Sequence, residues 1–179
     1  MKNLIKPIIV LTAIAFVCTA ALSGVNSLTS EIIAKAAAEK KAATMQELFP
    51  GEQGFDVVEI DAETLNTYAS SGVYKAASGK GYIVEVAPAG YGGEIKMMVA
   101  FNNECEVLKV KILEHAETSG IGTRVVGDED YLSQYVGKNA KNPEGVDAIS
   151  GATISSKAVL SGINNAMNLI TSPAMAAEQ

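Results

Sequence analysis

The pattern of apolar and polar residues divides the chain into a long apolar run followed by short alternating stretches. Residues 7–30 contain no charged side chain, and residues 7–25 are rich in Ile, Leu, Val, Ala and Phe. A bilayer core of about 30 Å needs roughly 20 such residues in a helix, so this run is long enough to span a membrane. Lys2 and Lys6 precede it and Glu31 follows it. This order predicts a cytoplasmic N-terminus and a domain on the extracytoplasmic side of the cell membrane.

A cleaved signal peptide is the alternative for this run, because Ala20 and Ala21 are small enough for a cleavage site. The run is longer than the apolar region of a signal peptide, which is usually about 7–15 residues. Cys18 follows Phe16 and Val17 rather than the small residue of a lipoprotein site. We therefore expect residues 1–30 to comprise a cytoplasmic start and a retained transmembrane helix. Either alternative places the domain outside the cytoplasm.

Residues 31–50 are predicted to form a helical stalk that leaves the membrane. The stretch is rich in Ala, Glu and Lys, which favour helices. Ser30 is positioned to cap this helix, and Pro50 and Gly51 are positioned to end it. Its Lys and Glu side chains are interpreted as a solvated face.

Beyond residue 50 the apolar residues alternate with a period of two, which is typical of strands. Short strands are predicted over residues 55–60, 72–76 and 82–86. Residues 94–101 and 104–113 alternate more clearly, and Asn102-Asn103 between them tolerates the positive φ of a two-residue turn. They predict an antiparallel hairpin with one buried face. The positions assigned to that face are Ile95, Met97, Val99, Phe101, Leu108, Val110 and Ile112.

Two helices are predicted after the hairpin. Residues 128–136 begin with acidic residues suited to a helix start, and one side of this helix carries Tyr131, Leu132, Tyr135 and Val136. A second helix is predicted to begin at Ser155 or Ser156 and to end at about residue 170, before Ser172-Pro173. Its core stripe contains Val159, Ile163 and Ile170.

The predicted fold class is therefore α+β: an N-terminal transmembrane helix and helical stalk, followed by an antiparallel sheet flanked by helices. The sheet and its helices form a domain over residues 51–172. Residues 173–179 are predicted to be a flexible tail.

Composition excludes several classes of function. The net charge is −6 and no basic run extends beyond Lys40-Lys41, so nucleic-acid binding is not expected. The two cysteines, Cys18 and Cys105, fall short of the three or four ligands of a typical iron–sulfur or thiolate–zinc site, so no metal site is predicted. The sequence has no G-x-G-x-x-G after a strand, no P-loop and no G-x-S-x-G. No catalytic residue is assigned, and the chain is not expected to oxidise NADH by itself.

Residues 146–157, VDAISGATISSK, form the most informative segment. Thr153 lies just before the predicted helix start, beside the small residues Ser150, Gly151 and Ala152. The free N–H groups and the positive dipole end at a helix start stabilise a phosphate, so a phosphate on or near Thr153 is one interpretation. An ordinary small-residue loop with a helix cap is the alternative, and the residue types alone favour it.

Residues 147–153, DAISGAT, resemble the flavinylation motif of the FMN-binding domain family, an Asp followed closely by Ser/Thr-Gly-Ala-Thr. In that family a flavin transferase moves FMN from FAD onto the Thr hydroxyl as a phosphoester. The resemblance implies one covalent FMN on Thr153, and it makes Asp147 part of the signal that the transferase reads. It also makes Ser150, Gly151 and Ala152 the approach to Thr153. Ser155, at the predicted helix start, is assigned to the cofactor site as well.

Residues 115–122, HAETSGIG, resemble a second motif of this family, His-x-Glu-Thr-Pro-Gly-Leu/Ile-Gly. A Gly-rich loop after a strand also lets backbone approach a ligand closely. Ser119 replaces the usual Pro, which bears on the stiffness of the loop. The resemblance implies that the loop lies beside the flavin ring, although His115 itself is interpreted as a hydrogen-bonded loop histidine. The matching residues are His115, Glu117, Thr118, Gly120 and Gly122.

Residues 90–95, GYGGEI, resemble the Gly-Tyr-Gly-Gly turn of the same family. A tight turn is the favoured interpretation, and contact of Tyr91 with cofactor or partner is the alternative. The whole chain is similar to the G-subunit family of the Rnf complex, which is related to the C-subunit family of the sodium-pumping NADH:quinone reductase. In the Rnf family the complex couples ferredoxin–NAD electron transfer to Na⁺ or H⁺ translocation, which implies that other membrane subunits of that complex are partners.

The expected function is therefore an electron relay through covalent FMN in a membrane complex. Two alternatives remain. One is an anchored binding or scaffold module without a redox role, and the other is a stand-alone surface flavoprotein. A yellow, fluorescent purified protein separates the relay from the scaffold, and co-purification with membrane subunits separates it from the stand-alone flavoprotein.

Overall fold

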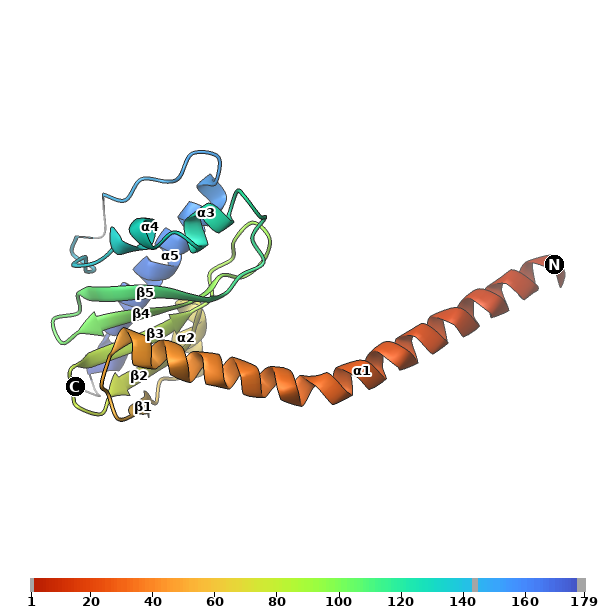
Figure 1. The fold of residues 1–179 in the computed structure, drawn as a ribbon, viewed down its shortest axis with the longest axis horizontal. Helices are drawn as coiled ribbons and strands as arrows, with labels where there is room; N and C mark the ends of the chain where they lie inside the picture. Colours follow the sequence, from red (N-terminus) through yellow and green to blue (C-terminus); the bar gives the residue numbers. More distant parts are fainter. Residues whose placement is uncertain (1, 143–144, 177–179) are drawn as a thin grey trace. The chain divides into compact units, whose positions relative to one another are not determined.

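The computed structural model describes residues 2–142 and 145–176, and it divides into two compact units, Met1–Ala42 and Ala43–Gln179 (Figure 1). The helix α1 (Lys2–Leu48) forms the first unit up to Ala42. Its last turns, from Ala43 onward, belong to the second unit. From Lys6 onward α1 is long and apolar enough to cross a membrane.

The predicted break between anchor and stalk is not present, because α1 runs without interruption through Ser30. Ser30 is therefore not a cap: its hydroxyl donates to the carbonyl of Ser27, one turn back in the same helix, at 3.3 Å. Thr29 bonds back to Val25 in the same way at 2.9 Å. Such bonds satisfy a hydroxyl inside a helix, so Ser and Thr need not end one.

The end of α1 at Leu48 agrees with the predicted stop at Pro50-Gly51. The last turns of α1 are not a free stalk, however, because Met45, Leu48 and the next residue, Phe49, are buried in a cluster with residues of the sheet. Their spacing of three and four residues places them on one side of the helix. The compact domain therefore begins at about Ala43 rather than at residue 51.

The second unit is built on one antiparallel sheet in which sequence neighbours pair in the order β1-β2-β3-β4-β5 (Figure 1). This arrangement confirms the predicted α+β class. The short helices α2 (Ala62–Thr67) and α3 (Thr123–Val126) were not predicted, since neither is long enough to show a helical period. The strands are β1 (Phe55–Val58), β2 (Ser70–Ala76), β3 (Gly81–Val86), β4 (Lys96–Asn102) and β5 (Val107–Glu114).

The predicted hairpin is β4–β5, but β4 is buried on both faces rather than on one. Val99 and Phe101 pack in the cluster that contains α5 (Thr153–Ile170), as predicted. Met98 and Ala100 on the opposite face are covered by the end of α1. The alternation of apolar and polar residues revealed only the first face, because the second is covered by a segment distant in sequence.

The connection between β4 and β5 differs from the predicted two-residue turn. Asn102 and Glu106 close it, with the amide of Asn102 donating to the carbonyl of Glu106 at 3.0 Å, and Cys105 between them has a φ of +60°. A bulge next to Phe101 places Val107 opposite Phe101. Leu108 is consequently 40% exposed instead of buried.

The predicted helix over residues 128–136 is shorter in the structure, where α4 spans Glu129–Ser133 and Asp128 caps it through the amides of Asp130 and Tyr131. Val136 was placed on the same side of the predicted helix as Tyr131, but it lies beyond the end of α4 and is half exposed. The other three residues assigned to that side are buried: Tyr131, Leu132 and Tyr135.

The core stripe of α5 is as predicted, with Val159, Ile163 and Ile170 buried. The tail predicted from residue 173 instead contains a short helix, α6 (Pro173–Ala176), in which Met175 is fully buried. Residues 177–179 lie outside the described residues.

Candidate functional site

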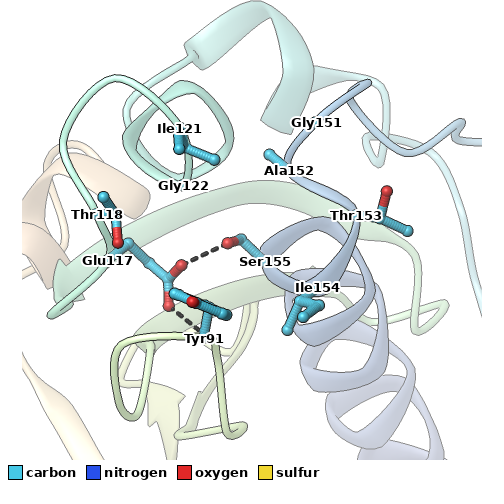
Figure 2. A pocket seen from close by; sticks show the side chains of 10 residues that line it. All are labelled: Tyr91, Glu117, Thr118, Ile121, Gly122, Gly151, Ala152, Thr153, Ile154 and Ser155. Atoms are coloured by element: carbon cyan, nitrogen blue, oxygen red, sulfur yellow. Dashed lines mark hydrogen bonds between the residues drawn. The ribbon is translucent and has the colours of Figure 1, made fainter.

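One pocket of about 490 Å³ lies where three separate segments of the chain meet (Figure 2). The segments are the β3–β4 connection, the loop that follows β5, and the start of α5. The volume is within the range of small-molecule sites, about 300–1,000 Å³. Its lining residues are Tyr91, Glu117, Thr118, Ile121, Gly122, Gly151, Ala152, Thr153, Ile154 and Ser155.

The helix α5 begins at Thr153, not at Ser155 or Ser156 as predicted. A turn precedes it, in which the amide of Ala152 donates to the carbonyl of Ile149 at 2.9 Å. Gly151 occupies the third position of this turn with a φ of +83°, in the region that favours glycine. The turn is held onto the helix by the Ser156 hydroxyl, which accepts from the amide of Ile149 at 3.0 Å.

The start of α5 presents free backbone donors to the pocket. Ala152 is the N-cap residue and gives no side-chain cap. The first intrahelical donor is the amide of Ser156, which bonds the carbonyl of Ala152 at 2.9 Å. Within the described part of the chain, the amides of Thr153, Ile154 and Ser155 have no hydrogen-bond acceptor. Uncapped amides at the positive end of an 18-residue helix form a favourable anion site.

Glu117 joins the three segments around the pocket. Its side chain is only 7% exposed. One carboxylate oxygen accepts from the backbone amides of Tyr91 at 2.8 Å and Gly92 at 3.1 Å, and the other accepts from the hydroxyl of Ser155 (Figure 2). We call these four residues the Glu117 cluster. It ties the β3–β4 connection and the loop after β5 to the first turn of α5.

Gly122 explains how the carboxylate fits so close to the helix. A Cβ atom at this position would lie 2.4 Å from the Glu117 carboxylate and 2.9 Å from the Ser155 hydroxyl. Any side chain here therefore displaces the Glu117 cluster. This requirement gives a physical reason for the last glycine of the segment 115–122.

The mouth of the pocket carries exposed apolar side chains. Tyr91, Ile121 and Ile154 are 68%, 52% and 55% exposed, and all three line the pocket. A planar aromatic ligand gains contact area from such side chains. Sequence patterns did not indicate Ile121 or Ile154 as site residues, although both lie in or beside the motifs that meet at this pocket.

The structure brings together seven of the predicted site residues and leaves four outside the pocket. Those that line it are Glu117, Thr118, Gly122, Gly151, Ala152, Thr153 and Ser155. Asp147, Ser150, His115 and Gly120 do not line it. The ring of His115 accepts from the amide of Glu117 at 3.3 Å, which agrees with its interpretation as a hydrogen-bonded loop histidine. No group of three His, Cys, Asp or Glu side chains among the described residues is placed to hold a metal ion.

Comparison with known proteins identifies two families along the chain. Residues 90–168 match the FMN-binding domain family, and residues 1–48 match the RnfG N-terminal region. The NqrC chain in the crystal structure of the Shewanella oneidensis protein is 26% identical to this chain. The matched region covers 60% of this chain and 64% of the NqrC chain, which is less than two thirds of NqrC. Its TM-score of 0.44 is too low to equate residues by superposition.

Three relatives are similar over nearly the whole chain. The G subunit of the ion-translocating oxidoreductase complex of Shewanella baltica (strain OS223) is 30% identical, over 93% of this chain and 90% of that protein. The G subunit of the proton-translocating ferredoxin:NAD(+) oxidoreductase complex of Clostridium ljungdahlii is 29% identical, over 90% and 88%. The G subunit of the Na(+)-translocating ferredoxin:NAD(+) oxidoreductase complex of Acetobacterium woodii is 28% identical, over 91% and 89%. The chain therefore belongs to the RnfG family, the G subunits of ion-translocating oxidoreductase complexes.

Proposed function

We propose that this protein is an electron-transfer subunit of an ion-translocating ferredoxin:NAD⁺ oxidoreductase, and that it carries one FMN bonded through its phosphate to Thr153. The observation that carries the proposal is the position of Thr153. Thr153 is exposed and lines the pocket at the uncapped start of α5, inside the segment that matches the FMN-binding domain family.

The residues present fit FMN at both of its ends. The amides of Thr153, Ile154 and Ser155 suit the charge of a phosphate. Tyr91, Ile121 and Ile154 suit an aromatic ring system, and the volume of the pocket is that of a small-molecule site. When bound, FMN supplies reversible electron transfer, which no side chain of the pocket provides.

Attachment requires an accessible hydroxyl and an activated phosphate. The Thr153 oxygen forms a bond to the phosphorus of the FMN half of FAD, the bond from that phosphorus to the AMP half breaks, AMP leaves, and the hydroxyl proton is released. A flavin transferase is the proposed catalyst. Asp147 and Ser150 lie on the loop before Thr153 and outside the pocket, in keeping with a role in recognition by that enzyme rather than in binding the ring.

The other pocket residues position the cofactor and need no acid–base role. The Glu117 cluster fixes the three segments of the pocket relative to one another. Thr118 is exposed at the edge of the pocket and offers a hydroxyl to the ligand. A covalent phosphoester prevents loss of cofactor on the extracytoplasmic side, where replacement is difficult.

The helix α1 is the proposed membrane anchor, with the N-terminus in the cytoplasm and the domain on the extracytoplasmic side. The proposed partners are the other membrane subunits of the Rnf complex, from which electrons arrive and to which they leave. On this proposal the chain contributes one step of the oxidoreductase reaction and completes none alone.

The test is the mass of the full-length protein, purified in detergent from cells that contain a flavin transferase. The proposal predicts an adduct of one FMN less one water, fluorescence that survives denaturation, and a modified peptide in which Thr153 carries the mass. A colourless protein of unmodified mass from such cells overturns the proposal and favours the scaffold alternative.

A further inference from the structure

Glu117 places a carboxyl group in the wall of the pocket. Among the described residues, it is the only Asp, Glu, Lys or Arg that lines the pocket. Its carboxylate accepts hydrogen bonds at both oxygens, and all its donors are neutral: two backbone amides and the Ser155 hydroxyl. No Lys, Arg or His in the described part of the chain forms an ion pair with it. The pocket wall therefore holds a carboxylate without a compensating cation.

Neutral groups of the pocket wall hold both oxygens of this side chain. One oxygen lies within hydrogen-bond distance of the amides of Tyr91 and Gly92, and the other lies within hydrogen-bond distance of the Ser155 hydroxyl. The positive end of α5 lies beside it, because Ser155 belongs to the first turn of that helix. None of these neighbours carries a full positive charge, so no ion pair among the described residues compensates a negative charge on Glu117.

We propose that Glu117 lowers the reduction potential of the bound flavin. The inference rests on the proposed function, since it requires FMN in this pocket. Each electron that the ring accepts from a neighbouring redox subunit adds one negative charge until a proton is taken up. A fixed negative charge in the wall of a partly buried pocket raises the free energy of the more negative, reduced ring relative to the oxidised ring. Glu117 is thus a positioning residue through its hydrogen bonds and an electrostatic one through its charge.

The decisive variant is Glu117→Gln, which removes the charge and keeps the shape. Its amide oxygen still accepts from the amides of Tyr91 and Gly92, and its amide nitrogen can donate to Ser155. We expect a more positive midpoint potential in a spectroelectrochemical titration of the flavin-loaded protein. At a fixed electrode potential, the ratio of reduced to oxidised flavin is expected to rise at least tenfold. For a two-electron couple, a tenfold change corresponds to a shift of about 30 mV in the midpoint potential.

Two further variants separate charge from structure. Glu117→Asp keeps the charge and is expected to restore most of the wild-type potential. Ser155→Ala removes a neutral donor whose dipole partly offsets the carboxylate, so it is expected to lower the potential, opposite in sign to Glu117→Gln. A merely structural role of the Glu117 cluster predicts that Glu117→Asp, which keeps the charge but shortens the side chain, shifts the potential at least as much as Glu117→Gln. Intact mass confirms the flavin load of each variant, and thermal unfolding confirms its fold.

The outcomes distinguish this inference from the proposed function. A wild-type protein without a flavin adduct overturns the proposed function. A flavin-loaded Glu117→Gln variant with an unchanged or more negative potential overturns the inference alone. If Glu117→Gln does not fold or load, Ser155→Ala decides: a lower potential supports the inference, and an unchanged or higher potential overturns it.

Discussion

The last turns of α1 are predicted to be essential for the stability of the domain, which can be tested by truncation. Met45, Leu48 and Phe49 are 7%, 5% and 7% exposed and cover the face of the sheet that carries Ile83 and Met98. Burying one such side chain contributes about 1.5–3 kcal/mol, so the three together contribute roughly 5–9 kcal/mol. Residual compactness of the unfolded chain reduces this figure by about 10–40%. The loss is comparable with a typical domain stability of about 5–15 kcal/mol.

The assay is urea unfolding, followed by circular dichroism, of two soluble fragments, 43–179 and 51–179. The longer fragment is expected to unfold cooperatively, and the shorter one to be largely unfolded in buffer. In the full chain, Leu48→Ala is expected to destabilise the domain by about 2–5 kcal/mol. Ile33→Ala is the matched control, since Ile33 is an apolar residue of the same helix with an exposed side chain. Equal urea midpoints for the two fragments would refute the role assigned to the end of α1.

Three other predictions concern the loop after β5, the Glu117 cluster and the membrane topology. Ser119→Pro is expected to stabilise the domain by about 0.4–1 kcal/mol. Ser119 occupies the second position of a turn closed by the amide of Ile121, and proline is favoured at that position. A lower melting temperature of the variant would argue against this geometry. Gly122→Ala is expected to reduce flavin loading, measured as absorbance per protein, because its Cβ displaces the Glu117 carboxylate; Gly54→Ala, with open space around it, is the control. Protease added to intact cells whose outer envelope is permeabilised is expected to remove the domain, and cleavage only in inverted membranes would reverse the proposed sidedness.

The sequence was informative where a regular period extends over many residues. The hairpin β4–β5 and the core stripe of α5 follow from alternation and helical spacing, and both are present in the structure. The second buried face of β4 was not predictable in this way. Met98 and Ala100 occupy positions that the pattern assigned to the other face, and the residues that cover them precede β1. Short elements such as α2 carry too few residues to show a period.

The sequence predicted most residues of the candidate site, but it did not predict the hydrogen bonds that join them. The segments around Thr153 and Glu117 were identified by residue type and resemblance, and the structure places both at one pocket. The hydrogen bond from Ser155 to Glu117 joins residues 38 positions apart, and local patterns contain no signal for it. That contact also explains the wrong helix start: Ser155 and Ser156 were taken as caps, whereas their hydroxyls hold Glu117 and Ile149 from inside the helix.

The central claim is that the Thr153 hydroxyl carries the flavin. Thr153→Ala removes the acceptor oxygen at little cost to the fold. The side chain is exposed, it forms no hydrogen bond within the described residues, and Ala favours helices, so the expected change in stability is within about 0.5 kcal/mol. Thr153→Ser keeps the hydroxyl and is expected to retain some modification. Ser161→Ala is the matched control, because it removes an exposed hydroxyl of the same helix that lies outside the motif and the pocket and leaves the acceptor in place.

The measurement is the intact mass of each full-length variant made in cells with a flavin transferase, together with in-gel flavin fluorescence after denaturation. The account predicts an FMN adduct on the wild-type protein and on Thr153→Ser, and none on a folded Thr153→Ala variant. An FMN adduct that persists on Thr153→Ala would contradict it.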